Sequence, residues 1–402
     1  MDQGMPVEFG AEARGPLAGI RVLDLSSVVS GPLCAQVLGD LGADVVKLEP
    51  LGGETARRLG MPMNEGISPL FAGCNRNKRS IAVDLKSERG VAVARRVAAK
   101  ADVLVENYRP DVAPRLGLGY ETLSEANPGL IYVSISGFGP DGPYSQLPAY
   151  DTVIQGLTGF LPVQGEAIPR LVQCIAADKT TALTAVYGVT TALFARERGD
   201  GRGQHVHVPM LDAYAAYLLP DLLGTKTFPA APPMPTVDLH RTWATRDGYV
   251  VMMIVEDSQF FGICRALGRD DLIEDPRCAN LIPRILHSEE LFAILAGEIR
   301  KQPTDELVAR CRVEGAPVAP VNDLDDFLAD PQVAANHTVF EIDGGPGVGN
   351  IRMARQPVRL PGTPATVRRP PPRLGEHTDA VLTEIGLGAD EIATLRAEGV
   401  LA

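Results

Sequence analysis

The chain has 402 residues, of which 45% are apolar and 22% are charged. This composition is ordinary for a globular protein, and the length predicts two domains or one large elaborated domain. The net charge of −12 argues against sequence-independent binding to nucleic acid, which needs a basic face. Residues 1–16 carry acidic side chains and no apolar run, and every apolar stretch is shorter than a membrane span requires. We expect a cytoplasmic protein without nucleic-acid or membrane partners.

The first half of the chain alternates between strand and helix patterns. Residues 19–25 form an apolar run rich in β-branched side chains, and a Ser/Gly/Pro turn leads into a helical pattern at 33–41. Gly42 ends that pattern before a second strand at 43–48, which predicts a right-handed βαβ unit. The alternation continues in the segments expected as strands and helices, namely 80–85, 87–100, 102–106, 130–135, 179–196 and 204–208. This order predicts a parallel sheet covered on both faces.

Two proline-rich segments interrupt this pattern. Residues 228–235 contain four prolines, which exclude a helix or a central strand and indicate a linker. Beyond it, a hairpin with Asp247 and Gly248 at its turn precedes several short helices and a strand, which is typical of a small α+β domain. A second Pro/Gly/Arg-rich stretch at 357–374 indicates a returning linker, and the last residues are helical.

The residues exclude several kinds of site. The turn after the first strand contains only Gly31 where an NAD-binding fold would have GxGxxG, so we expect no NAD. The six cysteines lack CxxC spacing and are expected to be buried free thiols rather than zinc ligands or disulfides. His205 and His207 alternate on a predicted strand without a third ligand nearby, so we expect no metal site.

Carboxylates at the starts of helices are the candidate reactive groups. Asp178 lies where the long apolar helix begins, so it is either a structural N-cap or a carboxylate that the helix N-terminus keeps ionised for nucleophilic attack. Tyr150 and Asp151 follow a Gly/Pro-rich loop and fit either a helix cap or a site. Glu256, at the end of a strand, leaves the same two interpretations open.

Seven segments, taken in order, resemble the class III CoA-transferase family, which includes formyl-CoA transferase, carnitine CoA-transferase and α-methylacyl-CoA racemase. They span nearly the whole chain and are residues 16–25 (PLAGIRVLDL), 38–50 (LGDLGADVVKLEP), 77–81 (NKRSI), 101–110 (ADVLVENYRP), 137–143 (GFGPDGP), 201–204 (GRGQ) and 374–379 (LGEHTD).

The resemblance implies an α/β fold in which both chain ends build a Rossmann-like large domain and a smaller α+β domain lies between them. It also implies a homodimer of two interlocked rings. The expected parts of the chain are a large domain (1–222), a linker (223–240), a small domain (241–335), a return linker (336–374) and C-terminal helices that complete the large domain (375–402).

The resemblance also assigns roles to individual positions. Asp178 matches the family's nucleophile, while Tyr150 and Asp151 match the pair that lines the thioester pocket. Six other positions match contacts to coenzyme A. Three of them match contacts to its nucleotide, namely Val29, Ser30 and Val83. The other three match positions that hold coenzyme A, namely Asn107, Tyr108 and Arg115. Glu256 matches the carboxylate that acts with a His in the racemases, but this chain has Tyr150 in place of that His.

The expected activity is the transfer of coenzyme A from an acyl-CoA donor to a free carboxylic acid, through an aspartyl–acyl anhydride and an aspartyl-CoA thioester, without metal or NAD. One alternative is a 2-methylacyl-CoA racemase that exchanges the α-proton. It is disfavoured because an unperturbed tyrosine, with a pKa of about 10, is a poor base. The other alternative is a non-catalytic acyl-CoA-binding protein.

Overall fold

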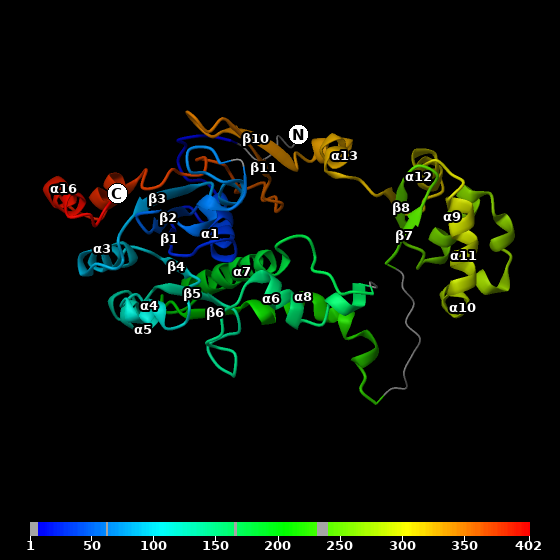
Figure 1. The fold of residues 1–402 in the computed structure, drawn as a ribbon, viewed down its shortest axis with the longest axis horizontal. Coiled ribbons are helices and arrows are strands. Elements are labelled where there is room, and N and C mark those ends of the chain that lie inside the picture. The colour runs from blue at the N-terminus through cyan, green and yellow to red at the C-terminus, as the bar shows by residue number, and fades with distance from the viewer. Residues whose placement is uncertain (1–6, 62, 165–166, 231–239) are drawn as a thin grey trace. The chain divides into compact units, whose positions relative to one another are not determined.

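The computed structural model describes residues 7–61, 63–164, 167–230 and 240–402. The chain forms two compact units, Met1–Gly224 with Ala335–Ala402, and Thr225–Ala334 (Figure 1). Both ends of the chain therefore belong to the larger unit. The core of the expected linker at 223–240 falls on 231–239 and lies outside the described residues.

A six-stranded parallel sheet is the centre of the larger unit. Its strand order is β3-β2-β1-β4-β5-β6, the order of a doubly wound nucleotide-binding sheet. The strands are β1 (Arg21–Asp24), β2 (Asp44–Glu49), β3 (Lys78–Ala82), β4 (Val103–Glu106), β5 (Ile131–Ser136) and β6 (His205–Pro209). All five strand pairs are parallel, so the predicted α/β class with a parallel sheet is confirmed.

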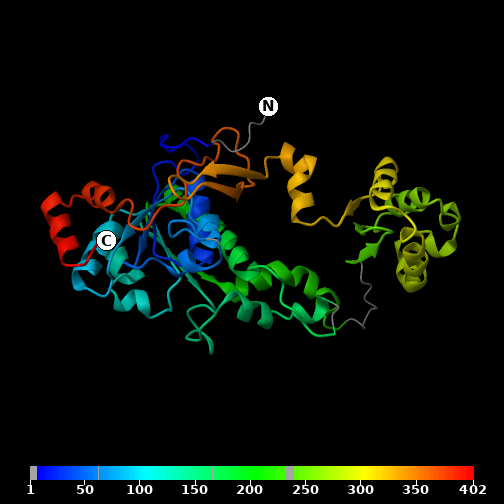
Figure 2. The same ribbon diagram turned by 45° about the horizontal axis from the view of Figure 1, so that its top comes forward.

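Alternating side chains of these strands enter two separate cores, because successive residues of a strand point to opposite faces. Val22 and Val45 pack with α1 and α7. Their neighbours Leu23 and Val46 pack on the other face with α3 and the C-terminal helices. Figures 1 and 2 show α1 and α7 beside each other against the sheet. Both faces are covered, as the continuous apolar strands predicted.

The helices of the larger unit include those expected at 33–41, 87–100 and 179–196, which are present as α1, α3 and α7 with small shifts at their ends. They are α1 (Ser30–Asp40), α2 (Pro69–Cys74), α3 (Glu88–Ala98), α4 (Val112–Arg115), α5 (Tyr120–Ala126), α6 (Asp151–Leu157), α7 (Ala176–Arg198), α8 (Met210–Leu222), α15 (Thr378–Glu384) and α16 (Ala389–Ala397). Short 3₁₀ turns lie at η1 (Thr55–Arg58) and η2 (Leu161–Gln164). Ser87 caps α3, with its side chain accepting from the Gly90 N–H at 3.0 Å.

The segment 336–374 is more than a linker. It contains an antiparallel hairpin, β10 (Val339–Asp343) with β11 (Asn350–Ala354). Ile342 and Met353 of this hairpin are buried in the same core as α1. The segment expected as a return linker thus contains paired strands that pack in the core of the larger unit.

The smaller unit has a core of its own, with Trp243, Phe260 and Leu295 buried in it. Its antiparallel strands are β7 (Thr242–Ala244), β8 (Tyr249–Met252) and β9 (Val318–Pro320), in the order β7-β8-β9. Its helices are α9 (Asp257–Leu267), α10 (Leu281–Leu286), α11 (Ser288–Ile299), α12 (Thr304–Val313), α13 (Leu324–Ala329) and α14 (Pro331–Ala335), with 3₁₀ turns at η3 (Gly224–Lys226), η4 (Asp270–Leu272) and η5 (Pro276–Cys278). The predicted hairpin around Asp247 and Gly248 is confirmed.

Two further findings concern the chain as a whole. Five cysteines are buried, but Cys174 is exposed, so the expectation of buried thiols was wrong at this position. Among the helices in the described part of the chain, none combines the length and the apolar character needed to cross a membrane.

Candidate active site

Asp178 lies inside the first turn of α7. The helix begins at Ala176, and Ile175 occupies the N-cap position, so the interpretation of Asp178 as a structural cap was wrong. The Ser30 hydroxyl and backbone N–H, at the start of α1, are the groups whose hydrogen bonding lowers the pKa of the Asp178 carboxyl. The first turn of α1, which holds pyrophosphate in dinucleotide-binding folds, is directed here at a carboxylate. Ser30 was expected to contact a nucleotide, whereas the structure places it against the candidate nucleophile.

The electrostatic environment of Asp178 differs from the expectation. Burial raises the pKa of this carboxyl to about 6, the Ser30 hydrogen bonds keep it below the value that burial alone would give, and the charge of Asp151 raises it. At pH 7 the ionised form is therefore about tenfold in excess. The carboxylate is available as a nucleophile, yet it is more basic than an exposed aspartate.

Asp151 supplies the cap that α7 lacks in its own sequence. Its Oδ1 accepts from the backbone N–H groups of Ala177 at 2.7 Å and Asp178 at 3.1 Å. Gln155 donates to its Oδ2 at 2.6 Å. The side chain is only 8% exposed, and its negative charge faces the positive end of the helix dipole. Asp151 thus fixes the helix turn that carries Asp178.

Replacing Asp151 with alanine is expected to destabilise the protein by about 1–2 kcal/mol, because two buried backbone donors lose their acceptor. Asp151→Asn keeps an acceptor oxygen and should therefore lose less stability than the alanine variant. Urea unfolding followed by circular dichroism gives both values. Equal losses for the two variants would contradict the capping role.

Tyr150 begins α6 as its N-cap residue and is 70% exposed. Its ring therefore lies at the surface of the described unit, in contrast to its buried neighbour Asp151. The structure brings Asp151 and Asp178 together and leaves Tyr150 facing outward.

The turn between β1 and α1 is held by side chains from distant parts of the chain. Asn107 accepts from the Ser27 N–H at 2.9 Å and donates to the Ser27 carbonyl at 2.8 Å. Val28 has a φ of +70°, an outlier for a β-branched residue that costs roughly 1–3 kcal/mol. Gly31 is required here, since a Cβ at this position would lie 2.2 Å from the Cβ of Ser26. The expected CoA ligand Asn107 thus acts in this structure as a support of the turn.

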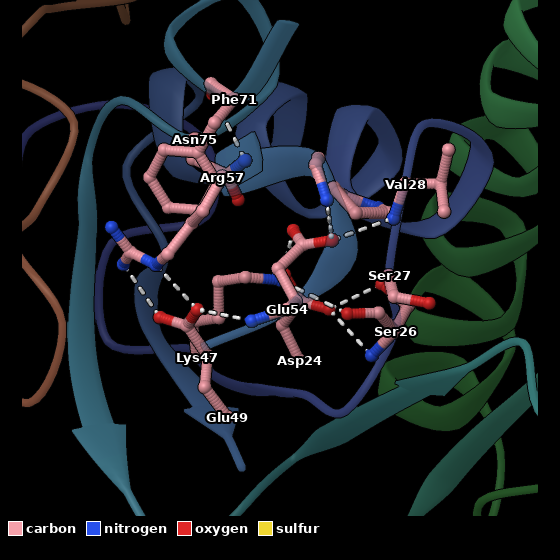
Figure 3. Close-up of polar contacts among 12 residues, drawn as sticks. Asp24, Ser26, Ser27, Val28, Lys47, Glu49, Glu54, Arg57, Phe71 and Asn75 are labelled. Carbon is pink, nitrogen blue, oxygen red and sulfur yellow. Dashed lines mark hydrogen bonds and ion pairs between the residues drawn. The ribbon is translucent and has the colours of Figure 1, made fainter. Parts of the chain in front are cut away.

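A cluster of buried charges lies beneath the turn (Figure 3). It was not predicted from the sequence. Asp24 contacts Lys78 at 2.7 Å and Lys47 at 3.5 Å, and Lys47 also contacts Glu54 at 3.2 Å. Arg57 pairs with Glu49 at 2.7 Å. Burial alone would raise the pKa of Asp24, but the two lysines lower it to about 2. The signal was present in the sequence, because a lysine and acids within apolar strands must be paired when the strands are buried.

The remaining expected CoA contacts are spread along the carboxyl ends of the strands. Val29 and Val83 are fully buried, and the Val83 N–H donates to the Glu49 carbonyl at 2.9 Å. Glu106 holds the turn after β4 by accepting from the Tyr108 N–H at 2.8 Å. Arg115 is exposed and pairs with Asp111 at 3.0 Å, which leaves its guanidinium at the surface.

Two other candidates lie on elements other than α1, α6 and α7. Glu256 is the N-cap residue of α9, where its N–H donates to Gln259 at 3.3 Å, and it belongs to the smaller unit. The rings of His205 and His207 are tilted by 38° with their centroids 3.8 Å apart, and His205 contacts the Ser134 hydroxyl at 2.9 Å. Within the described residues no group of three or more His, Cys, Asp or Glu could hold a metal ion.

Residues 17–378 match the family model described as CoA-transferase family III. The chain therefore belongs to this family and is an enzyme of its class. It is 35% identical to a succinate–glutarate CoA-transferase of Agrobacterium fabrum, over 92% of this chain and 96% of that protein. It is 34% identical to an acetyl-CoA:oxalate CoA-transferase of Acetobacter aceti, over 93% of this chain and 97% of that protein.

A crystal structure of a CaiB/BaiF family protein from Brucella suis shares the fold. It is 34% identical in sequence, superposes with a TM-score of 0.80, and the match covers 92% of this chain and all of that one. The resemblance noted in the sequence is thereby confirmed. The relatives are named as transferases. Their names therefore do not favour the alternative of a non-catalytic acyl-CoA-binding protein.

Proposed function

We propose that the chain transfers coenzyme A from an acyl-CoA donor to a carboxylic acid with Asp178 as the nucleophile. The observation that supports this most is the Asp178 carboxyl in the first turn of α7, whose pKa is raised to about 6 by burial and held from rising further by Ser30. Such a group is ionised at neutral pH and more basic than an ordinary aspartate, which suits attack on a thioester carbonyl.

The exchange proceeds in four attacks. The Asp178 carboxylate attacks the donor thioester carbonyl and expels the CoA thiolate, which gives an aspartyl–acyl anhydride. The thiolate then attacks the aspartyl carbonyl and releases the donor acid, leaving an aspartyl-CoA thioester. The acceptor carboxylate attacks that thioester and expels thiolate, forming a second anhydride. Finally the thiolate attacks the acceptor's acyl carbon, and the Asp178 carboxylate is regenerated.

Coenzyme A would lie along the carboxyl ends of the strands, where ligands bind in doubly wound sheets. The residues proposed to hold it are Val29, Ser30, Val83, Asn107, Tyr108 and Arg115. The exposed ring of Tyr150 would line the thioester pocket beside Asp151. An interlocked homodimer would help to exclude water from the anhydrides, which hydrolyse readily. The chemistry needs neither a metal ion nor NAD.

The acids are proposed from the relatives. The names of the two curated relatives contain succinate, glutarate and oxalate, which are all dicarboxylates. We therefore expect a dicarboxylic acid as acceptor. Succinyl-CoA and acetyl-CoA as donors, each with glutarate, succinate or oxalate as acceptor, form the first assay panel.

Trapping tests the proposal directly. The protein is incubated with succinyl-CoA and then with hydroxylamine, which cleaves an aspartyl thioester to a hydroxamate, and the peptides are analysed by mass spectrometry. We expect the modification on the peptide that carries Asp178, and none without acyl-CoA. Modification of another carboxylate would overturn the assignment. Incubation of the protein with a 2-methylacyl-CoA alone in deuterated water tests the racemase, which would incorporate α-deuterium into that thioester without any acceptor acid.

A further inference from the structure

The turn formed by Ser26, Ser27 and Val28 is held by three side chains that come from different segments. Asn107 binds both backbone groups of Ser27. Lys47 donates to the Ser26 carbonyl at 2.9 Å, and Glu54 Oε2 accepts from the Val28 N–H at 2.8 Å. Figure 3 shows the Glu54 carboxylate directed at the Val28 nitrogen. Of these three side chains, Glu54 is the one that contacts Val28, the residue with the strained backbone.

Glu54 is itself held rigidly. Its Oε2 also accepts from the Ala56 N–H at 3.2 Å, where it caps η1, and its own N–H donates to Glu49 at 3.2 Å. Lys47 Nζ lies 3.2 Å from Oε1, and the Glu54 side chain is only 4% exposed. A fixed anion at this point can keep Val28 at a positive φ that a valine would otherwise leave.

The conformation of Val28 determines where Ser30 points. Val29 is the N-cap residue of α1 and Ser30 is the first residue of the helix, so rotation at Val28 moves both donors of Ser30 relative to Asp178. If Ser30 moves away, its hydroxyl and N–H no longer lower the pKa of Asp178.

We propose that Glu54 is a positioning residue of the transfer reaction, which holds Val28 in its left-handed conformation and thereby aims Ser30 at the nucleophile Asp178. The role in catalysis rests on the proposed function, whereas the link from Glu54 to Asp178 is a property of the fold. Two kinds of measurement therefore separate them.

Ionisation of Asp178 is measured without substrate, from infrared difference spectra of the carboxyl stretch between each protein and the same protein carrying Asp178→Asn. In Glu54→Ala the Val28 N–H loses its acceptor, so we expect the pKa of Asp178 to rise above its native value of about 6. Asp151 is the charged group that faces Asp178 from α6. Asp151→Asn removes that negative charge and should shift the pKa of Asp178 in the opposite direction, which calibrates the method.

Turnover is measured with succinyl-CoA and glutarate. In Glu54→Ala we expect kcat to fall by about 10²-fold, as for a displaced catalytic group. We expect little change in KM for succinyl-CoA, and an acid limb of kcat/KM that moves to higher pH. Val28→Gly provides a rescue, because glycine adopts a positive φ without strain. The double variant Val28→Gly with Glu54→Ala should recover most of the lost kcat and return the pKa of Asp178 toward its native value.

Asp40→Asn is the matched control for loss of a buried charge. Asp40 is fully buried at the far end of α1 and pairs with Arg76 at 2.6 Å. We expect it to lower the melting temperature and to leave the titration of Asp178 unchanged. A folded Glu54→Ala protein with a native titration of Asp178, or a failure of Val28→Gly to restore it, would overturn the proposal. If Asp178→Asn still transfers CoA, the proposed function fails instead, and the titration decides the role of Glu54 alone.

Discussion

Replacing Asp178 with asparagine is expected to lower the rate of CoA exchange by about 10³-fold or more, because an amide cannot form the anhydride and the thioester that carry the acyl group and CoA. The rate of glutaryl-CoA formation from succinyl-CoA and glutarate, followed by mass spectrometry, measures the loss. Glu197→Gln, at the other end of the same helix, is the control and should keep the native rate. Native turnover in Asp178→Asn would exclude Asp178 as the nucleophile.

The same substitution should stabilise the protein at neutral pH. The folded pKa of Asp178 is about 6, above the value of about 3.9 in an unfolded chain. Between these values the folded state binds more protons, so the stabilising contribution of protonated Asp178 is present below about pH 4 and is lost as the pH rises through 6. Asparagine carries no charge and avoids the cost of burying the ionised carboxylate. It should therefore raise the free energy of unfolding by about 1–2 kcal/mol at pH 7 after allowance for solvent screening. Melting temperatures at pH 4 and pH 7 test this, and a gain at pH 4 equal to that at pH 7 would contradict it.

Asp24→Asn is expected to destabilise the protein by about 3–5 kcal/mol, because it leaves Lys47 and Lys78 buried without the carboxylate that lies between them. Urea unfolding, with the midpoint compared at constant slope, gives the change in the free energy of unfolding. The pKa of Asp24 is lowered to about 2 in the folded state. Its contribution to stability is therefore present above about pH 4 and is lost as the pH falls through 2, and the difference between the two proteins should shrink over that range.

An exposed pair provides the comparison for Asp24. Arg96 and Glu391 lie 2.8 Å apart on the surface, with 42% and 44% of their side chains exposed. Glu391→Gln should change the free energy of unfolding by less than about 1 kcal/mol, since exposed pairs contribute little. If Asp24→Asn lowers the free energy of unfolding no more than Glu391→Gln does, the buried charge cluster does not stabilise the turn before α1.

Much of the fold could be predicted from the sequence because its signals are local. The apolar runs of β1 and β2, the helix between them and the cap at Ser87 lie close to the segments they define, and parallel order follows from the alternation of strand and helix. The start of α7 was misplaced because its cap is supplied by Asp151, a residue outside that helix and its flanking turn. Local capping rules do not detect a cap of this kind.

The site was only partly predictable for the same reason. Family resemblance pointed to Asp178 as the proposed nucleophile, but the influence of Ser30 on it depends on how α1 packs against α7. The support from Glu54 depends on a turn whose valine has a backbone conformation that its side chain disfavours. By itself the sequence determined the parallel sheet, the order of its elements and the family, since these follow from periodicity and ordered motifs. Only the tertiary structure decided which charges are paired and what faces Asp178, because burial and distance arise when remote segments pack together.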